Sequence, residues 1–369
     1  MPRPALKERW KEPVVPEIDF DGLACPSPRA AYEHVLLGHG SGGRMTADLI
    51  RRSFLPALRN KVLAALEDQA TVDFGNNGSG ERLAITTDAF VVKPIFFPGG
   101  DIGRLAVHGT VNDLAVGGAR PLFLAAAFIL EEGLSIRDLE RIAGSMRAAC
   151  DEAGVSLVTA DTKVVDRGKG DQIFITTTGI GLVPADCRLS IHAARPGDRI
   201  LVSGTIGDHG IAIMSVREGI EFETVLESDT ASLVELTRAL LEACPGIRAM
   251  RDPTRGGLSS ALHELAEASH VGVKLMEAAI PLRNEVRAAC EMLGLDPLYV
   301  ASEGKLIAVA AAEDAQRALA AMRAQPLGRN AAIIGQVVAD HPGMVTIRSP
   351  LGGERVVTML AGEQLPRIC

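Results

Sequence analysis

Four aspartates stand where an apolar run of the chain meets a turn or a helix-like segment. Asp88 ends LAITTD, Asp113 lies in TVNDLA, Asp161 follows VSLVTA, and Asp252 lies in RDPTRGG. Carboxylate oxygens from several such places are the hard ligands that hold Mg²⁺ beside nucleotide phosphates. A single aspartate of this kind is more often a helix cap or a turn former. The set of four therefore predicts a Mg²⁺ site more strongly than any one of them does.

A glycine-rich segment, GHGSGGR, covers residues 38–44 and precedes a helix-like run. Such loops bring backbone N–H groups to an anion at the positive end of a helix. Gly40, Gly42 and Gly43 are the predicted contacts. The segment matches neither the Walker pattern nor a dinucleotide fingerprint, so a hairpin without a binding role remains an alternative.

Two further residues have the character that proton transfer and charge neutralisation require. Lys163 lies in DTKVV, two residues after Asp161, and Glu303 lies in ASEGKLIAV at the start of an apolar run. A lysine beside phosphate oxygens neutralises developing charge, and a carboxylate at the mouth of a strand serves as a base. Either residue is equally compatible with an ordinary surface charge, because periodicity does not distinguish the two.

The chain ends in EQLPRIC, and its last residue, Cys369, is a thiol on a short arm. The seven residue steps from Gly362 allow a reach of roughly 25 Å. Pro366 disfavours helix and removes one N–H donor, which predicts an extended and loosely held segment. The cysteines are scattered without a CxxC pair, which predicts neither a zinc site nor a disulfide framework; the other five are Cys25, Cys150, Cys187, Cys244 and Cys290.

The elements that must position these residues are predicted to form two α/β domains. The chain has 369 residues, of which 47% are hydrophobic and 4% aromatic, with 38 glycines. Domains typically contain about 100–200 residues. A composition change at HAARPGDRILVSG indicates a boundary near residue 190. We therefore expect an extension over 1–35, an ATP-binding domain over 36–190, a second domain over 191–361 and a tail over 362–369.

Hydrophobic periodicity places the individual elements. A helix is expected from residue 136, where Ile136, Leu139, Ile142 and Met146 recur behind Ser135, a predicted N-cap. Strands are expected over 82–92, 171–183, 199–203, 305–310 and 332–338, and helical segments over 228–244 and 257–270.

Charge and hydropathy exclude several classes of partner. The formal net charge is −8, without a basic block or a basic and aromatic stripe, so nucleic acid is not an expected partner. Neither a secretory signal peptide nor a membrane span is recognisable. These features predict a cytoplasmic protein.

Several blocks together resemble the hydrogenase maturation HypE family of carbamoyl dehydratases, in order, from about Leu36 to Cys369. They are FFPGGDIGRLAVHGTVNDLAVGGARP, DTKVVDRGKGD, GDHG, DPTRGGL, SEGKL and the terminal PRIC. The family belongs to the superfamily of aminoimidazole ribonucleotide synthetase and selenophosphate synthetase. The resemblance implies a two-domain α/β (α+β) PurM-like fold, N-terminal sheets pairing across a homodimer, ATP in clefts between domains and subunits, and a flexible C-terminal tail.

The resemblance also implies an activity for the tail. In the family, a HypF-type carbamoyltransferase modifies the terminal cysteine, and the thiocarboxamide is dehydrated with ATP to a thiocyanate. The cyanide group then passes to iron held by a HypC–HypD complex, for the active site of [NiFe]-hydrogenase.

Residue roles carry over onto the matching motifs. The resemblance implies Cys369 as the acceptor, Lys163 as the cation beside the transferring phosphoryl group and Glu303 as the base. The implied Mg²⁺ ligands are Asp88, Asp113, Asp161 and Asp252. Asn112 is an implied nucleotide or metal contact, whereas His108 is equally compatible with a packed helical histidine. Ser302 replaces the Asn common before the family's glutamate, which leaves the orientation of Glu303 open.

Two other functions remain open on the residues. One is a relative that phosphorylates or cyclises a small metabolite, such as a selenophosphate synthetase, although Cys25 lacks the neighbouring lysine of that family. The other is a carrier or scaffold with a decayed ATP site. ATP hydrolysis by the carbamoylated protein would discriminate between the carrier and the enzyme.

Overall fold

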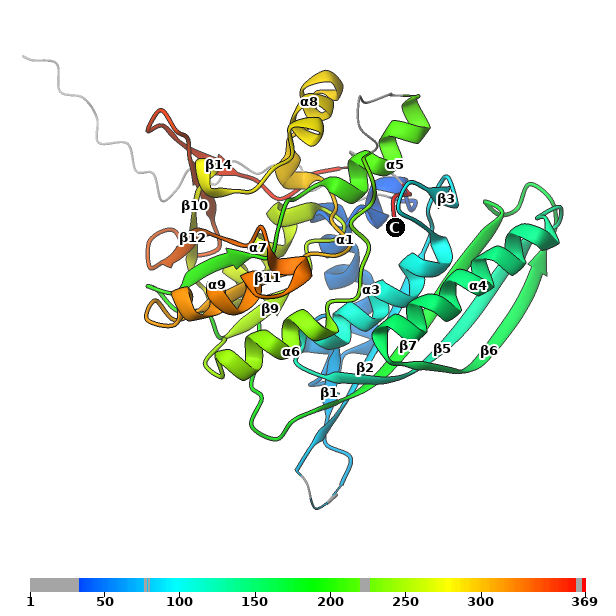
Figure 1. Cartoon of the computed structure of the whole chain (residues 1–369), viewed down its shortest axis with the longest axis horizontal. Helices are drawn as coiled ribbons and strands as arrows, with labels where there is room; N and C mark the ends of the chain where they lie inside the picture. Colours follow the sequence, from blue (N-terminus) through cyan, green and yellow to red (C-terminus); the bar gives the residue numbers. More distant parts are fainter. Residues whose placement is uncertain (1–32, 76–77, 79, 220–225, 363–366) are drawn as a thin grey trace, which may run out of the picture. The chain divides into compact units, whose positions relative to one another are not determined.

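The computed structural model describes residues 33–75, 78, 80–219, 226–362 and 367–369. Residues 36–369 form one compact unit that contains two large sheets (Figure 1). Within the described residues, no helix has both the length and the apolar character needed to cross a membrane.

The N-terminal sheet has five strands in the order β1-β2-β7-β5-β6. Neighbouring strands are antiparallel except for β5 and β6, which are parallel. Helices α3 and α4 cover one face of the sheet (Figure 1). The strands are β1 (Ala70–Val72), β2 (Arg82–Phe90), β5 (Arg120–Glu131), β6 (Ser156–Val165) and β7 (Ile173–Val183).

The two helices on this sheet begin at side-chain caps. Asp101 accepts hydrogen bonds from the backbone N–H groups of Gly103 and Arg104, which starts the almost wholly buried helix α3 (Ile102–Val116). Ser135 caps α4 (Ile136–Ala153), and the helix packs its apolar stripe against α3. The predicted helix and its N-cap are confirmed.

The C-terminal sheet has seven strands in the order β14-β13-β10-β12-β8-β11-β9. Alternate residues of β8 enter two different cores. Ile200 and Val202 pack with α7, and Leu201 packs with α6 and α9, so helices cover both faces. The elements are β8 (Arg199–Val202), α6 (Val234–Ala243), β9 (Ala249–Arg251), α7 (Gly257–Ser269), β10 (Gly272–Met276), β11 (Ile307–Ala310), α9 (Ala315–Arg323), β12 (Ala332–Val338), β13 (Val345–Arg348) and β14 (Glu354–Val357).

The predicted strands are confirmed, with ends that differ by a few residues. The helical segment expected over 228–244 begins only at Val234, because the Asn112 side chain on α3 binds the Ala231 carbonyl and the Leu233 N–H before it. The remaining elements of the described residues are η2 (Leu37–Gly40), α1 (Arg44–Leu49), η3 (Ile50–Phe54), α2 (Leu55–Leu58), η4 (Leu63–Ala65), β3 (Phe96–Phe97), β4 (Gly100–Asp101), α5 (Asp208–Glu218), η5 (Glu277–Ala279), α8 (Asn284–Leu293), η6 (Pro297–Tyr299) and η7 (Pro326–Gly328).

Candidate active site

Three carboxylates meet at the junction of the two sheets. Asp68 precedes β1, Asp113 lies on α3, and Asp252 follows β9, yet their nearest oxygens all lie within 4.8 Å of one another. Thr86 on β2 ties two of them together, because its hydroxyl lies 2.8 Å from Asp113 Oδ2 and 3.0 Å from the Asp68 carbonyl. The structure thus brings together two of the four predicted Mg²⁺ ligands.

Asp68 is a site residue that the sequence prediction missed. It follows no long apolar run and precedes a strand of only three residues. The signal was the pairing of that strand: Ala70 lies opposite Ile85, so an antiparallel β1–β2 pair carries Asp68 toward the end of β2 that bears Asp88. A prediction of strand pairing, and not of strand position alone, would have found it.

The acid cluster carries more negative charge than its protein neighbours compensate. Burial raises the pKa of Asp68 to about 8, with Arg251 opposing and Asp252 reinforcing the change. Burial raises the pKa of Asp252 to about 6, and burial together with Asp252 and Asp68 raises the pKa of Asp113 well above its usual range. Arg251, with its Nη2 3.0 Å from Asp68 Oδ1, offsets part of the charge. A bound cation would relieve the rest.

Asp88 lies beside this cluster and faces a cation from the other sheet. Its side chain is on the face of β2 that packs on α3, and Oδ1 lies 3.4 Å from Arg255 Nη2. Asp88 contributes to raising the pKa of both Asp113 and Asp252, which places its charge close to theirs.

The glycine loop approaches the same arginine. Gly42 has φ +73°, and a Cβ there would lie 2.6 Å from Arg255 Cβ, so only glycine fits this conformation and contact. Gly43 begins α1 and would place a Cβ 2.3 Å from the Leu360 carbonyl. Gly40 is exposed and has open space around its Cβ position. The structure therefore places Gly42 and Gly43, but not Gly40, against the site.

Glu303 is buried in the loop before β11. Its backbone N–H donates to Asp229 Oδ1 at 3.0 Å, and its carbonyl accepts from Asn112 Nδ2 at 3.2 Å. Burial raises the pKa of Glu303 well above its usual range, Asp252 and Asp88 raise it further, and Arg255 opposes them. Within the described residues, Glu303 Oε1 is buried without a hydrogen-bond partner. A raised pKa makes the ionised carboxylate a stronger proton acceptor.

The Asn112 side chain binds protein backbone in this structure. Its side chain is fully buried, and both Nδ2 hydrogens are used, one on the Ala231 carbonyl at 3.0 Å and one on the Glu303 carbonyl. Its Oδ1 accepts from Leu233 N at 2.8 Å. Asn112 thus fastens α3 to the segment before α6 and to the Glu303 loop. The described partners of the amide are all backbone groups, and a nucleotide or metal contact of Asn112 stays a prediction.

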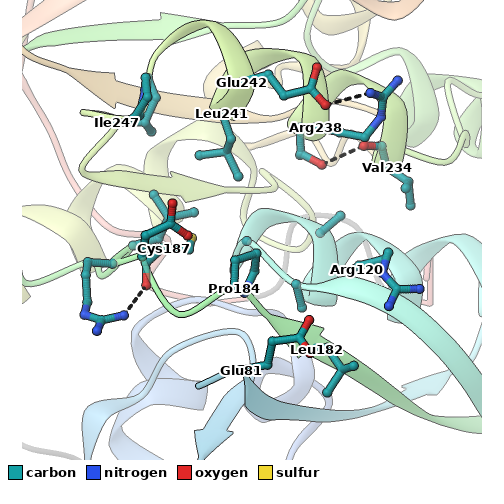
Figure 2. A pocket seen from close by; sticks show the side chains of 18 residues that line it. Glu81, Arg120, Leu182, Pro184, Cys187, Val234, Arg238, Leu241, Glu242 and Ile247 are labelled. Carbon is teal, nitrogen blue, oxygen red and sulfur yellow. Dashed lines mark hydrogen bonds and ion pairs between the residues drawn. The ribbon is translucent and has the colours of Figure 1, made fainter. Parts of the chain in front are cut away.

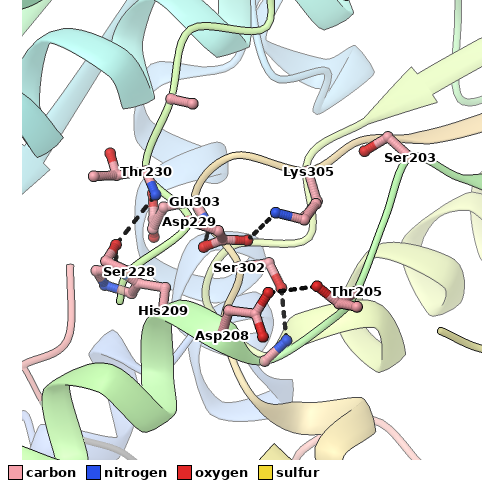
Figure 3. A network of polar contacts seen from close by, with 12 residues as sticks. Ser203, Thr205, Asp208, His209, Ser228, Asp229, Thr230, Ser302, Glu303 and Lys305 are labelled. Carbon is pink, nitrogen blue, oxygen red and sulfur yellow. Dashed lines mark hydrogen bonds and ion pairs between the residues drawn. The ribbon is translucent and has the colours of Figure 1, made fainter. Parts of the chain in front are cut away.

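The surroundings of Glu303 form a polar network shown in Figure 3. Asp229 lies at its centre and pairs with Lys305, whose Nζ is 2.9 Å from Asp229 Oδ2. Ser302 accepts a 2.9 Å hydrogen bond from Gly207 N. Ser302 thus fastens the loop before β11 to the backbone at residue 207. Gly304 is required here, because a Cβ would lie 1.8 Å from the Asp229 carbonyl.

Cys369 lies inside this site. Its half-buried side chain packs against the core beneath α3 and faces the Glu303 carboxyl group. The chain end is marked C in Figure 1, next to β3 and α3. Burial raises the pKa of the Cys369 thiol well above its usual range, and Glu303 raises it further. A thiol in this position stays protonated and is a weak nucleophile.

Residues 367–369 are not loosely held, in contrast to the prediction from Pro366. Ile368 is buried and forms an antiparallel bridge with Val92, and Val91 N donates to a terminal carboxylate oxygen of Cys369 at 3.2 Å. Strand-like pairing offsets the conformational entropy that an extended segment loses. Pro366 itself lies outside the described residues.

Asp161 and Lys163 are not brought to this site by their own chain. Both lie on the edge strand β6, with side chains 71% and 72% exposed, and they pair with each other at 2.9 Å. Their partners in β5 are Ala127 and Ile129, so they point to the sheet face away from α3. Within a single chain Asp161 and Lys163 therefore lie apart from the acid cluster, and their predicted roles stay a prediction.

His108 is a packed helical histidine. It is fully buried in α3, its Nδ1 lies 3.4 Å from Thr230 Oγ1, and burial lowers its pKa to about 3. The neutral ring fills the junction between α3 and the segment before α6, without contact to the acid cluster in the described structure.

Two cavities lie near the two ends of this junction. One of about 450 Å³ is lined by Gly42, Gly43, Glu67, Arg251 and other residues, and it adjoins the acid cluster. The other, of about 480 Å³, is drawn in Figure 2 between β7, the segment after it and α6. The described lining of this second cavity includes none of the predicted site residues, so its size alone does not indicate the active site.

Comparison with known proteins decides the family. The AIR synthase related protein N-terminal domain matches residues 66–183, and the corresponding C-terminal domain matches residues 195–348. Carbamoyl dehydratase HypE of Azotobacter vinelandii is 59% identical over 331 residues, 90% of this chain and 96% of that protein. The chain belongs to the HypE family.

Solved HypE structures agree in fold. HypE in a HypE–HypF complex has a TM-score of 0.80 and 46% identity, covering 85% of this chain and 99% of that chain. HypE in complex with ATP has a TM-score of 0.76 and 49% identity, covering 91% and 100%. The predicted HypE resemblance and two-domain α/β, PurM-like fold are confirmed.

Proposed function

We propose that this chain is an ATP-dependent carbamoyl dehydratase that converts a thiocarboxamide on Cys369 to a thiocyanate, the source of the cyanide ligand of [NiFe]-hydrogenase iron. The observation that carries the proposal is the position of the Cys369 side chain, which faces buried Glu303 beside a cluster of carboxylates. Relatives named carbamoyl dehydratase HypE, up to 59% identical over 90% of the chain, support it.

The proposed reaction removes the carbonyl oxygen and two N–H protons from the thiocarboxamide. Oxide and hydroxide are poor leaving groups, so the oxygen first takes the γ-phosphoryl group of ATP, and its C–O bond then breaks to release phosphate. As the two protons leave nitrogen, its electron pairs complete the C≡N bond. Glu303 is positioned to accept a proton, since the modified side chain would extend from the sulfur that faces it. The products are the thiocyanate, ADP and phosphate.

The acid cluster fits Mg²⁺ bound to nucleotide phosphates. Asp68, Asp113 and Asp252 offer hard oxygen ligands from three separate elements, and their raised pKa values show that the protein alone does not balance their charge. Mg²⁺ supplies charge neutralisation at the transferring phosphoryl group. The adjoining cavity of about 450 Å³ under Gly42 and Gly43 is of suitable size for a nucleotide. The HypE relative described in complex with ATP supports this assignment.

A homodimer accounts for the exposed positions of Asp161 and Lys163. The sheet face that bears them also carries Phe123, Ile129 and Ile180, which are 46%, 41% and 37% exposed. We propose that this apolar face pairs with a second copy and that the β6 edge then supplies Asp161 and Lys163 to the partner's cleft. Lys163 would there neutralise charge on the transferring phosphoryl group.

The proposed reaction on the C-terminal tail requires two partner proteins. A HypF-type carbamoyltransferase would load Cys369, which the HypE–HypF complex of a relative supports, and a HypC–HypD complex would accept the cyanide group. The inner thiol is a weak nucleophile, so loading is expected at an outward position of the arm. We place these reactions in the cytoplasm.

The test is the mass of the C-terminal peptide after incubation with the carbamoyltransferase, carbamoyl phosphate and Mg·ATP. We expect the gain of one carbamoyl group and then the loss of one water. Cys369→Ala should abolish both changes, while Cys187→Ala, the matched control at another half-buried cysteine, should undergo both. Complete dehydration on another cysteine of Cys369→Ala would contradict the terminal-thiol mechanism.

A second variant separates the enzyme from a passive carrier. Glu303→Gln keeps the size of the side chain and removes the base, so the reaction should stop at the carbamoylated species. A carrier with a decayed site would neither hydrolyse ATP on carbamoylation nor respond to this change.

A further inference from the structure

Each of the last three residues is held through a main-chain oxygen. A terminal carboxylate oxygen of Cys369 accepts from Val91 N at 3.2 Å, and the Arg367 carbonyl accepts from Lys93 N at 3.1 Å. The Ile368 carbonyl lies 2.6 Å from His209 Nε2 on α5. The tail thus forms an extra short strand beside residues 91–93, with the Cys369 side chain directed to Glu303.

Asp171 holds this strand from the outside. Its Oδ2 accepts from Arg367 Nη1 at 2.5 Å, and its Oδ1 accepts from Lys93 Nζ at 3.3 Å. One carboxylate therefore ties the tail to the segment on which it lies. The Asp171 side chain is 19% exposed and that of Arg367 is 42% exposed, so the pair is accessible to solvent and salt.

Arg217, near the end of α5, holds the same two residues from the other side. Its Nη2 donates to the Arg367 carbonyl at 2.8 Å and to the Lys93 carbonyl at 2.6 Å. Its Nε also reaches the Lys93 carbonyl at 3.2 Å. The planar guanidinium thus bridges the tail and its docking segment with a single rigid group.

His209 is fixed so that it donates to the tail. Its pKa is lowered by burial, so the ring is neutral and only one of its nitrogens carries a hydrogen. The Ile368 carbonyl accepts at Nε2, which therefore carries that hydrogen, and Ser228 Oγ at 2.7 Å donates to Nδ1. Phe97 packs against the imidazole in a T-shaped contact, with the two ring centroids 5.5 Å apart.

We propose that Asp171, Arg217 and His209 form a tail latch. These positioning residues set the fraction of protein molecules in which Cys369 lies at Glu303. All three bind the backbone or Arg367, and none of these contacts involves the reacting sulfur. The latch favours the inner position for dehydration and opposes the exit that loading and transfer require. The assignment of dehydration to the inner position rests on the function proposed above.

The test is the alkylation rate of Cys369 by iodoacetamide in the full-length protein without nucleotide, measured on the C-terminal peptide by mass spectrometry. Asp171→Asn should raise the rate about two- to five-fold, the range for a partly exposed ion pair. Arg217→Gln, which removes hydrogen bonds from a charged donor, should raise it roughly ten-fold or more. Sodium chloride should accelerate the wild type toward the Asp171→Asn rate.

Matched variants separate the latch from a general loss of structure. Asp166→Asn changes an exposed acid of the same loop and should leave the alkylation rate of Cys369 unchanged. Asp171→Glu keeps the carboxylate, so its alkylation rate should stay close to that of the wild type. Cys187, in the same samples, should keep its wild-type rate. Unchanged Cys369 rates in both Asp171→Asn and Arg217→Gln, or an equal increase at Cys187, would overturn the proposal.

The rate of single-turnover dehydration distinguishes a positioning role of the latch from a purely structural one. In pre-carbamoylated protein, Asp171→Asn and Arg217→Gln should slow single-turnover dehydration without changing the ATP concentration that gives half the maximal rate. The alkylation result requires neither ATP nor carbamoylation, so a failure of the latch and a failure of the dehydratase function are distinguishable.

Discussion

The acid cluster and the β6 edge carry residues of the same predicted site in opposite environments. Asp68, Asp113 and Asp252 are held at the junction of two sheets, and their pKa values are raised by burial. Asp161 and Lys163 are more than two-thirds exposed and form an ion pair with each other. Burial assembles the first group within one chain, whereas the second group would act only in the proposed dimer, where another copy covers it.

The largest expected effect is on Mg·ATP binding, when a residue of the buried acid cluster is substituted. Asp113→Asn removes a charged oxygen from the cluster and should weaken Mg·ATP binding by roughly 100-fold or more, since even outer residues of metal sites cost about 10–100-fold. Calorimetry measures the change. Circular dichroism should stay unaltered and the apo variant should not be less stable, because the substitution relieves repulsion. Wild-type affinity in this variant would remove Asp113 from the site.

Substitution of the exposed residue Lys163 on β6 should slow dehydration without lowering the free energy of unfolding. Lys163→Ala should slow dehydration of the carbamoylated protein roughly 100-fold, the effect of removing one charge-stabilising donor. The free energy of unfolding should stay at the wild-type value, because the Lys163–Asp161 pair is solvent-exposed. Lys169→Ala, at an exposed lysine of the next loop, is the control. A large change in unfolding free energy would show that β6 has a structural role instead.

The buried acids should contribute to the pH dependence of stability, and a variant of Asp68 isolates their contribution. The Asp68 carboxyl has a folded pKa of about 8 against 3.8 for the free group, so the folded state binds more protons than the unfolded state between these values. The contribution of Asp68 to the stability of the metal-free protein should therefore fall as pH rises from about 4 to about 8, against the opposite contribution of buried His108 below about pH 6.5. Urea titrations in EDTA measure it. Asp68→Asn should flatten the slope and Asp161→Asn should not; equal slopes would contradict the burial contrast.

The sequence was sufficient for elements with long periodic patterns. Helix α4, with its Ser135 cap, and the strands β2, β7 and β12 were predicted because their apolar residues recur at one period without competing signals. Cys369 and Glu303, 66 residues apart in the chain, were predicted from motifs and lie together in the structure.

The remaining site features depend on contacts between distant segments. Asp68 joins the cluster through the pairing of β1 with β2. The Asn112 side chain forms its hydrogen bonds with backbone groups of residues 231, 233 and 303. Position beside a motif does not reveal whether an amide faces a ligand or a neighbouring loop. The hold of His209 and Arg217 on the tail likewise arises only when α5 meets residues 367–369.

The most direct test of the shared site is the mixing of two inactive variants. Carbamoylated Lys163→Ala has intact Glu303, and carbamoylated Glu303→Gln has intact Lys163, so a mixed dimer contains one complete site and one doubly defective site. After random exchange of subunits we expect dehydration at about a quarter of the wild-type level, from samples that are each inactive alone. Heterodimers demonstrated by native mass spectrometry that recover no dehydration would contradict a site formed by the buried cluster of one copy and the β6 edge of the other.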